Sequence, residues 1–85
     1  MNDLDQVALL AKQDDDQRQN FIQENEDLIL RLASKACGSY VTKSDDYYSI
    51  ALIAFNEAID SYDEGKGKFT SFASLVIKRR ILDEF

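Results

Sequence analysis

Residues 61–80 read SYDEGKGKFTSFASLVIKRR. A loop containing Gly65 and Gly67 is followed by apolar residues three and four positions apart, a pattern that predicts a loop leading into a helix. Five of the ten cations of the chain lie between Lys66 and Arg80, with no acidic residue among them. The rest of the chain carries five cations and 16 acidic residues, so we expect an acidic body with one basic surface.

The basic surface has two interpretations. It is typical of proteins that bind a large anion, and nucleic acid is the commonest anion of that size. Cations near the C-terminal end of a helix are also favoured by the helix dipole, which would make the same residues an ordinary solvated helix end. Charge alone does not decide between the two.

The composition narrows the class of protein. The chain has 85 residues, no histidine and one cysteine, Cys37. This length predicts one small domain, and a single cysteine excludes an internal disulfide framework. The absence of histidine removes the usual zinc sites and the usual general base, so we predict no enzyme, no catalytic residue, no metal site and no cofactor. No apolar run reaches the length of a membrane span and no basic signal-peptide start is present, so we expect a cytoplasmic protein.

Long proline-free segments with apolar residues at helical spacing predict an all-α fold, a compact bundle of about four helices. The first covers about residues 3–12. The second follows an N-cap in the aspartate triplet 14–16, bends near residues 24–26 and ends at a C-cap, Gly38. The third runs over about residues 46–62 after a cap at Ser44 or Asp45, and the last follows a cap at Thr70 or Ser71.

The third predicted helix carries apolar residues on a polar side. Leu52 and Ile53 fall among Ser49, Asn56 and Asp60 on the helical wheel. Apolar residues in a polar sector suggest a docking surface. The alternative is that another helix of the domain covers them.

The last predicted helix is apolar on two sides. Ala73, Ile77 and Ile81 form a stripe that we assign to the core. A second stripe contains Phe72 and Leu75, followed by Arg79 and Leu82, and its mixture of ring, aliphatic and cation suits stacking of an unpaired base beside a phosphate. The alternative is simple burial of Phe72 and Leu75.

These segments together resemble region 2 of the sigma-70 family, the promoter-recognition subunits of bacterial RNA polymerase. The resemblance rests on residues 61–74, on Asn25-Glu26-Asp27-Leu28 with Arg31-Leu32-Ala33, and on the run YYSIALIAFNEAI at 47–59. The last of these is most similar to the sigma-I group of clostridia and bacilli. We therefore expect residues 1–85 to be one sigma region 2 domain, the N-terminal domain. Asp83 and Glu84 lack a stop signal behind them, and the resemblance leads us to expect that the C-terminal promoter-binding domain of full-length members is absent from this chain.

The resemblance implies that the helix at 46–60 docks on the clamp helices of the largest RNA polymerase subunit. The implied contacts are Asp46, Ser49, Ile50, Ile53, Asn56 and Asp60. Housekeeping members of the family carry Gln and Glu where this chain has Ser49 and Ile50, so the chemistry of the contact is expected to differ.

The resemblance also implies that residues 69–80 bind and open the minus-ten element of promoter DNA. Phe72 stands where the family places an aromatic that receives a flipped-out base. The implied DNA contacts are Lys66, Lys68, Phe69, Ser71, Phe72, Leu75, Val76, Lys78, Arg79 and Arg80. Leu75 and Val76 replace paired tryptophans of housekeeping members, which implies a weaker wedge at the melting edge.

A third implied partner is a membrane-bound anti-sigma factor, as for other alternative sigma factors. Members of the sigma-I group are associated with heat response or with sensing of extracellular polysaccharide. The competing interpretation is a helical protein-interaction module that does not bind DNA. No small-molecule substrate is expected in either case.

Overall fold

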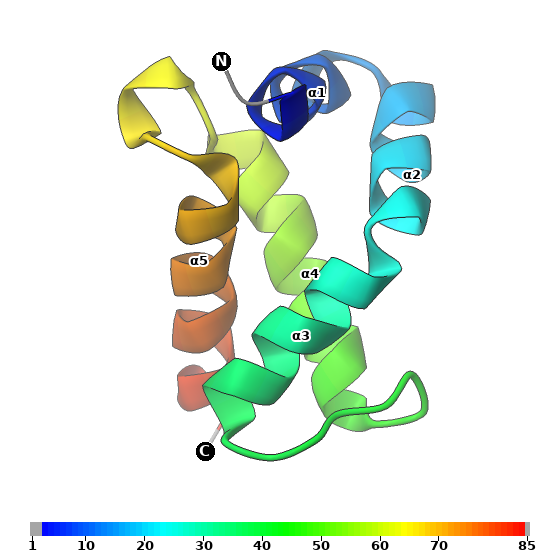
Figure 1. The fold of residues 1–85 in the computed structure, drawn as a ribbon, viewed down its shortest axis with the longest axis vertical. Helices are drawn as coiled ribbons and strands as arrows, with labels where there is room; N and C mark the ends of the chain where they lie inside the picture. The colour runs from blue at the N-terminus through cyan, green and yellow to red at the C-terminus, as the bar shows by residue number, and fades with distance from the viewer. Residues whose placement is uncertain (1–2, 85) are drawn as a thin grey trace.

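The computed structural model describes residues 3–84, and every regular element among them is a helix (Figure 1). The elements are α1 (Asp3–Gln13), α2 (Asp15–Glu24), α3 (Glu26–Cys37), α4 (Asp46–Ser61), the short 3-10 turn η1 (Glu64–Lys66) and α5 (Phe69–Asp83). The predicted all-α fold is confirmed, but the described residues form five α-helices rather than the predicted four or so. None of these helices is long and apolar enough to cross a membrane.

Asn25 accounts for the additional helix. The segment expected to bend here is interrupted, and Asn25 both ends α2 and precedes α3, with φ −114° and ψ 23°. Its side-chain amide donates to the carbonyl of Phe21 at 2.8 Å, while its own carbonyl accepts from the Ile29 N–H at 3.0 Å. A short polar side chain that satisfies the last carbonyls of one helix lets the chain begin another in a new direction.

The predicted caps on either side of this break are confirmed. Asp14 accepts a hydrogen bond from the Asp16 N–H at 2.9 Å and so caps α2, and Gly38 ends α3 in the left-handed conformation at φ 72°. Glycine tolerates that conformation because it has no Cβ.

Within residues 3–84 no group of three or more His, Cys, Asp or Glu side chains is placed to hold a metal ion.

The predicted cap of the last helix is wrong. Helix α5 begins at Phe69, before Thr70 and Ser71, and its preceding residue, Lys68, makes no side-chain cap. The Phe69 N–H donates instead to Asp5 Oδ1 on α1, at 2.7 Å. A carboxylate from another helix therefore satisfies one of the free donors at the start of α5, where negative charge also suits the helix dipole.

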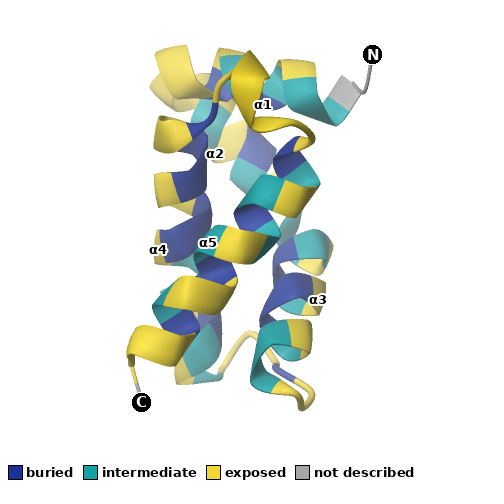
Figure 2. Ribbon diagram, turned by 90° about the vertical axis from the view of Figure 1, so that its left-hand side faces the viewer, coloured by how far each residue is buried: buried dark blue, intermediate teal, exposed yellow. Residues whose placement is uncertain are grey.

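Helices α4 and α5 run antiparallel as neighbours, α3 packs against both, and α1 lies across the end where η1 joins α4 to α5 (Figure 1). Figure 2 shows the buried sides of the helices turned toward one another. The core under the start of α5 is aromatic, with Phe69 centred 5.2–5.4 Å from three other rings, those of Phe21, Phe55 and Tyr62. Ala51, Ala54 and Ala58 are fully buried on α4, and their small side chains allow close approach of a neighbouring helix.

Candidate functional site

The connection from α4 to α5 is held by its own hydrogen bonds. Asp63 accepts from the Gly65 N–H at 2.9 Å, and the Tyr62 hydroxyl donates to the carbonyl of Gly67. Burial, reinforced by the nearby Asp5 carboxylate, raises the pKa of Tyr62, so its hydroxyl stays protonated as that donor. Gly67 has φ 81°, a conformation that side-chain-bearing residues rarely adopt. The turn therefore presents the exposed Lys66 and Lys68 on a defined backbone.

Phe72 lies on the first full turn of α5, beside these lysines. Its side chain is half-buried, with its ring centred 5.9 Å from the Tyr62 ring. Lys66 Nζ lies 5.9 Å from the centre of the same ring, within reach of a cation–π contact. The ring is thus supported by an aromatic of the core while part of it faces solvent next to a cation.

Phe69 requires a correction. It was among the implied DNA contacts, but its side chain is fully buried. The rings of Phe21, Phe55 and Tyr62 surround it, so the side chain reaches no ligand while the core is intact. We assign Phe69 to core packing and remove it from the candidate contacts.

The other nine implied DNA contacts are at least partly exposed and lie in η1, at the residue before α5 and on α5 outside its buried stripe. They are Lys66, Lys68, Ser71, Phe72, Leu75, Val76, Lys78, Arg79 and Arg80. Leu75 is 51% exposed, so its simple burial is excluded, whereas Val76 is half-buried against the core. Lys78 and Arg79 are exposed, and neither forms an ion pair within the described part of the chain.

The implied polymerase contacts lie together along the outer side of α4. Asp46, Ser49, Ile53, Asn56 and Asp60 are exposed, and Ile50 is half-buried. Ile53 is 52% exposed, so no helix among residues 3–84 covers it.

One end of this α4 surface is already engaged by Arg18 of α2. Arg18 donates to Asn56 Oδ1 at 3.0 Å and pairs with Asp60, while it also donates to the carbonyls of Ala11 and Lys12. The hydrogen bond from Arg18 lowers the pKa of the Asp60 carboxyl. The sequence analysis did not single out Arg18. The one pattern that could have indicated its role is that Arg18 is the single cation of α2.

Comparison with known proteins identifies the family of this chain. The model of sigma-70 region 2 matches residues 21–85. The chain belongs to the sigma-70 region 2 family. It is similar to the RNA polymerase sigma factor SigI of Bacillus subtilis (strain 168), with 40% identity over 78 residues, covering 91% of this chain and 31% of that protein. The SigI of Bacillus anthracis is 38% identical over 94% of this chain and 34% of its own length.

A third similar protein is the RNA polymerase sigma factor SigI8 of Acetivibrio thermocellus, which is 52% identical over 78% of this chain and 27% of its own length. The chain thus spans about a third of the length of the curated relatives it matches. The predicted resemblance to the sigma-70 family and its sigma-I group is confirmed.

Helix α1 precedes the part of this sigma-70 region 2 chain that the family model matches, yet it contacts the candidate site. Asp5 binds the start of α5, and Lys12 Nζ donates to the carbonyl of Tyr62 at 3.0 Å. Both contacts join residues at least 50 positions apart. No local sequence pattern predicted them.

Proposed function

We propose that this domain is the part of a cytoplasmic alternative sigma factor that binds core RNA polymerase through α4 and the minus-ten promoter element through α5. The observation that carries the proposal is a pair of outward surfaces on adjacent helices, with apolar side chains that the fold does not bury. Ile53 on α4 and Leu75 on α5 are each about half exposed. Exposed apolar residues rimmed by polar ones are typical of binding surfaces, and the family membership supports polymerase and DNA as the partners.

The α4 surface suits the clamp helices of the largest polymerase subunit. Ile53 supplies an apolar anchor, and Asp46, Ser49, Asn56 and Asp60 surround it along the helix. An apolar centre with a polar rim is the usual arrangement of a protein interface, and carboxylates on the rim attract a basic partner.

The α5 surface suits an unpaired base between phosphates. A base that leaves the stack of the promoter can stack on the open part of the Phe72 ring, while Lys66 and Lys68 hold neighbouring phosphates. Flipping a base costs a few kcal/mol, and stacking on an aromatic ring returns roughly 1–3 kcal/mol. Leu75 and Val76 add only aliphatic contact at the edge of the opened duplex, so we propose that this domain melts promoters weakly.

We further propose that a membrane-bound anti-sigma factor holds the domain inactive by covering exposed apolar residues such as Ile53. The relatives carry the name SigI, and the proposal rests on the resemblance to that group together with the uncovered apolar side chain. The domain itself catalyses no reaction under this proposal. Under this proposal the domain acts by positioning the polymerase on DNA.

The polymerase interface is tested by a pull-down with a purified fragment of the polymerase clamp helices. We expect capture of the wild-type chain and loss of capture for Ile53→Glu, because the substitution places a charge at the apolar anchor. Leu10→Glu is the matched control, since Leu10 is similarly exposed but lies on α1. Equal capture of both variants would contradict docking through α4.

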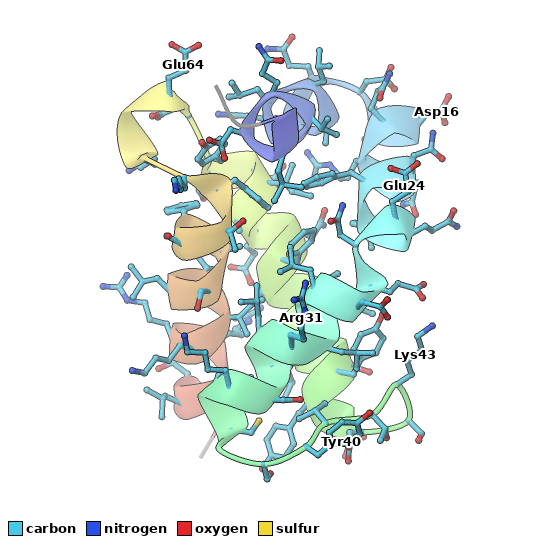
Figure 3. The ribbon with its side chains drawn as sticks, in the orientation of Figure 1. Asp16, Glu24, Arg31, Tyr40, Lys43 and Glu64 are labelled. Atoms are coloured by element: carbon cyan, nitrogen blue, oxygen red, sulfur yellow. The ribbon has the colours of Figure 1, made fainter. Side chains whose placement is uncertain are left out.

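The DNA interface is tested with a fluorescent single strand carrying a minus-ten sequence, added to the chain in complex with core polymerase. Phe72→Ala is expected to weaken binding by roughly 1–3 kcal/mol, the value of one stacked base. Tyr40→Ala is the control, because Tyr40 is an exposed aromatic on the connection between α3 and α4 (Figure 3). A loss of helical circular dichroism in Phe72→Ala would instead assign Phe72 to the core.

A second candidate function is a helical protein-interaction module without DNA binding. The observation that favours it is the ion pair of Arg80 with Glu57 of α4, which uses one basic-triplet residue inside the fold. Phosphate binding weakens steeply with added salt, whereas apolar docking does not. A salt-independent affinity for every partner would favour the module.

A further inference from the structure

Glu57 lies at the seam between the two proposed binding surfaces. Its Oε1 is 2.9 Å from Arg80 Nη2, and the two side chains are 50% and 42% exposed, respectively. The pair is therefore an ion pair at the molecular surface, accessible from solvent. Glu57 was not among the implied contacts of either surface.

The surroundings of this pair are balanced in charge. Glu57, Val76, Arg79, Arg80 and Asp83 line an open hollow of about 220 Å³ between α4 and α5. Two carboxylates thus face two guanidinium groups. A phosphate that approaches this end of α5 meets anions of its own sign.

The other end of the proposed DNA surface differs. Lys66 and Lys68 form no ion pair within the described residues, and Lys66 instead lies over the Phe72 ring. A phosphate there meets cations that no described carboxylate holds in an ion pair, although Asp5 and Glu64 line the same open hollow as Lys68. The acidic Glu64 of η1 carries its side chain outward at the tip of the turn (Figure 3).

We propose that Glu57 sets the affinity of this domain for DNA by competing with a backbone phosphate for Arg80. A carboxylate and a phosphate both pair with a guanidinium, so a phosphate that binds Arg80 competes with Glu57 for the same cation. A phosphate that binds Arg80 while Glu57 stays in place would lie beside a like charge, which is repulsive. This inference rests on the proposed DNA binding through α5 and adds a residue that opposes it.

The two ends of the α5 surface therefore contribute differently to DNA binding. The lysines at its start hold DNA in the free domain, and Arg80 contributes only when Glu57 releases it. The domain alone therefore binds DNA less tightly than its count of basic residues suggests. Removal of the carboxylate is expected to restore the contribution of Arg80.

The test is a titration of fluorescent single-stranded DNA at low salt, read by anisotropy, with the wild-type chain and Glu57→Gln. We expect the variant to bind about two- to fivefold more tightly, which is the range of an exposed ion pair. The slope of log affinity against log salt concentration should steepen by up to the amount that about one additional phosphate contact contributes. Glu24→Gln is the matched control, because Glu24 lies on α2, turned away from α5 (Figure 3), and has no ion pair within residues 3–84.

Arg80→Gln and the double variant Glu57→Gln/Arg80→Gln separate competition from a general change in charge. Competition predicts that Glu57→Gln has no more effect than Glu24→Gln once Arg80 is absent. An equal gain with and without Arg80, or no gain over Glu24→Gln, would overturn the inference while leaving DNA binding through Phe72 and the lysines in place. Failure of every variant to bind, with or without core polymerase, would overturn the proposed DNA binding itself and this inference with it.

Discussion

The two ends of α5 are built in opposite ways. At its start, Phe69 is fully buried among other rings and its N–H is bound by Asp5 of another helix. At its end, Lys78, Arg79 and Leu82 face solvent, and only Ile81 continues the buried stripe. The start of α5 is thus held by contacts with other helices, whereas the last turns leave more of their side chains exposed to solvent. Each end can be altered separately.

The largest effect is expected from Phe69→Ala. Removal of a fully buried aromatic costs roughly 3–5 kcal/mol of unfolding free energy, because three neighbouring rings lose their common contact. Urea denaturation followed by circular dichroism measures it. Phe72→Ala is the control, and its cost should be less than half as large because Phe72 is half-buried. Equal losses of unfolding free energy in the two variants would contradict the assignment of Phe69 to the core and of Phe72 to the binding surface.

Asp5→Ala is expected to cost about 1 kcal/mol, as loss of a helix cap usually does. The reason is that the Phe69 N–H loses its acceptor at 2.7 Å while the start of α5 stays packed. Urea denaturation gives the free energy, and hydrogen exchange at the Phe69 amide reports the bond directly. Asp5→Asn keeps an acceptor and should recover part of the loss. Unchanged exchange in Asp5→Ala would mean that another group caps α5.

A smaller effect is expected from the pairing of Asp60 with Arg18, close to the turn that leads into α5. The pKa of Asp60 is lowered in the folded chain, so its contribution is complete above the ordinary value of 3.8 and is lost as the pH falls through the folded-state pKa. Because Asp60 is 58% exposed, we expect less than about 1 kcal/mol. Denaturation of wild type and Asp60→Asn should differ at neutral pH and converge in acid. A difference that persists in strong acid would contradict this origin.

The smallest effect is expected at the far end of the helix. Leu82→Ala should change the unfolding free energy by less than about 0.5 kcal/mol, because the side chain is exposed. The adjacent Ile81→Ala is the matched comparison, with an expected loss of roughly 2–5 kcal/mol for a buried side chain. Thermal unfolding of both variants checks the contrast. A large loss in Leu82→Ala would show that this end is also part of the anchor.

Features that depend on neighbouring residues in the chain could be predicted from the sequence. Apolar spacing gave the helical class, and the caps at Asp14 and Gly38 follow from local chemistry that is the same in any helix. The polar sector around Ile53 suggested a docking surface, but burial beneath another helix stayed an open alternative that only the structure excluded.

Features that depend on the tertiary arrangement could not be predicted in this way. The sequence indicated a bend near residues 24–26, but not that the Asn25 side chain would bind the Phe21 carbonyl and end one helix there. Phe69 lies four positions before Ala73 and so belongs to the buried stripe of α5, but the helix was predicted to follow a cap at Thr70 or Ser71, and the stripe was not extended back to Phe69. The partners of Arg18 lie on another helix, beyond the range of any local pattern.

The bond between Asp5 and Phe69 joins residues 64 positions apart. During synthesis on the ribosome, α1 therefore emerges well before the helix whose start it binds. Ala8 and Ala11, which are fully buried in the finished domain, have no complete core to enter until α4 and α5 have followed. Nascent chains that end before α5 should therefore remain open to protease, and protection should arrive in a single late step.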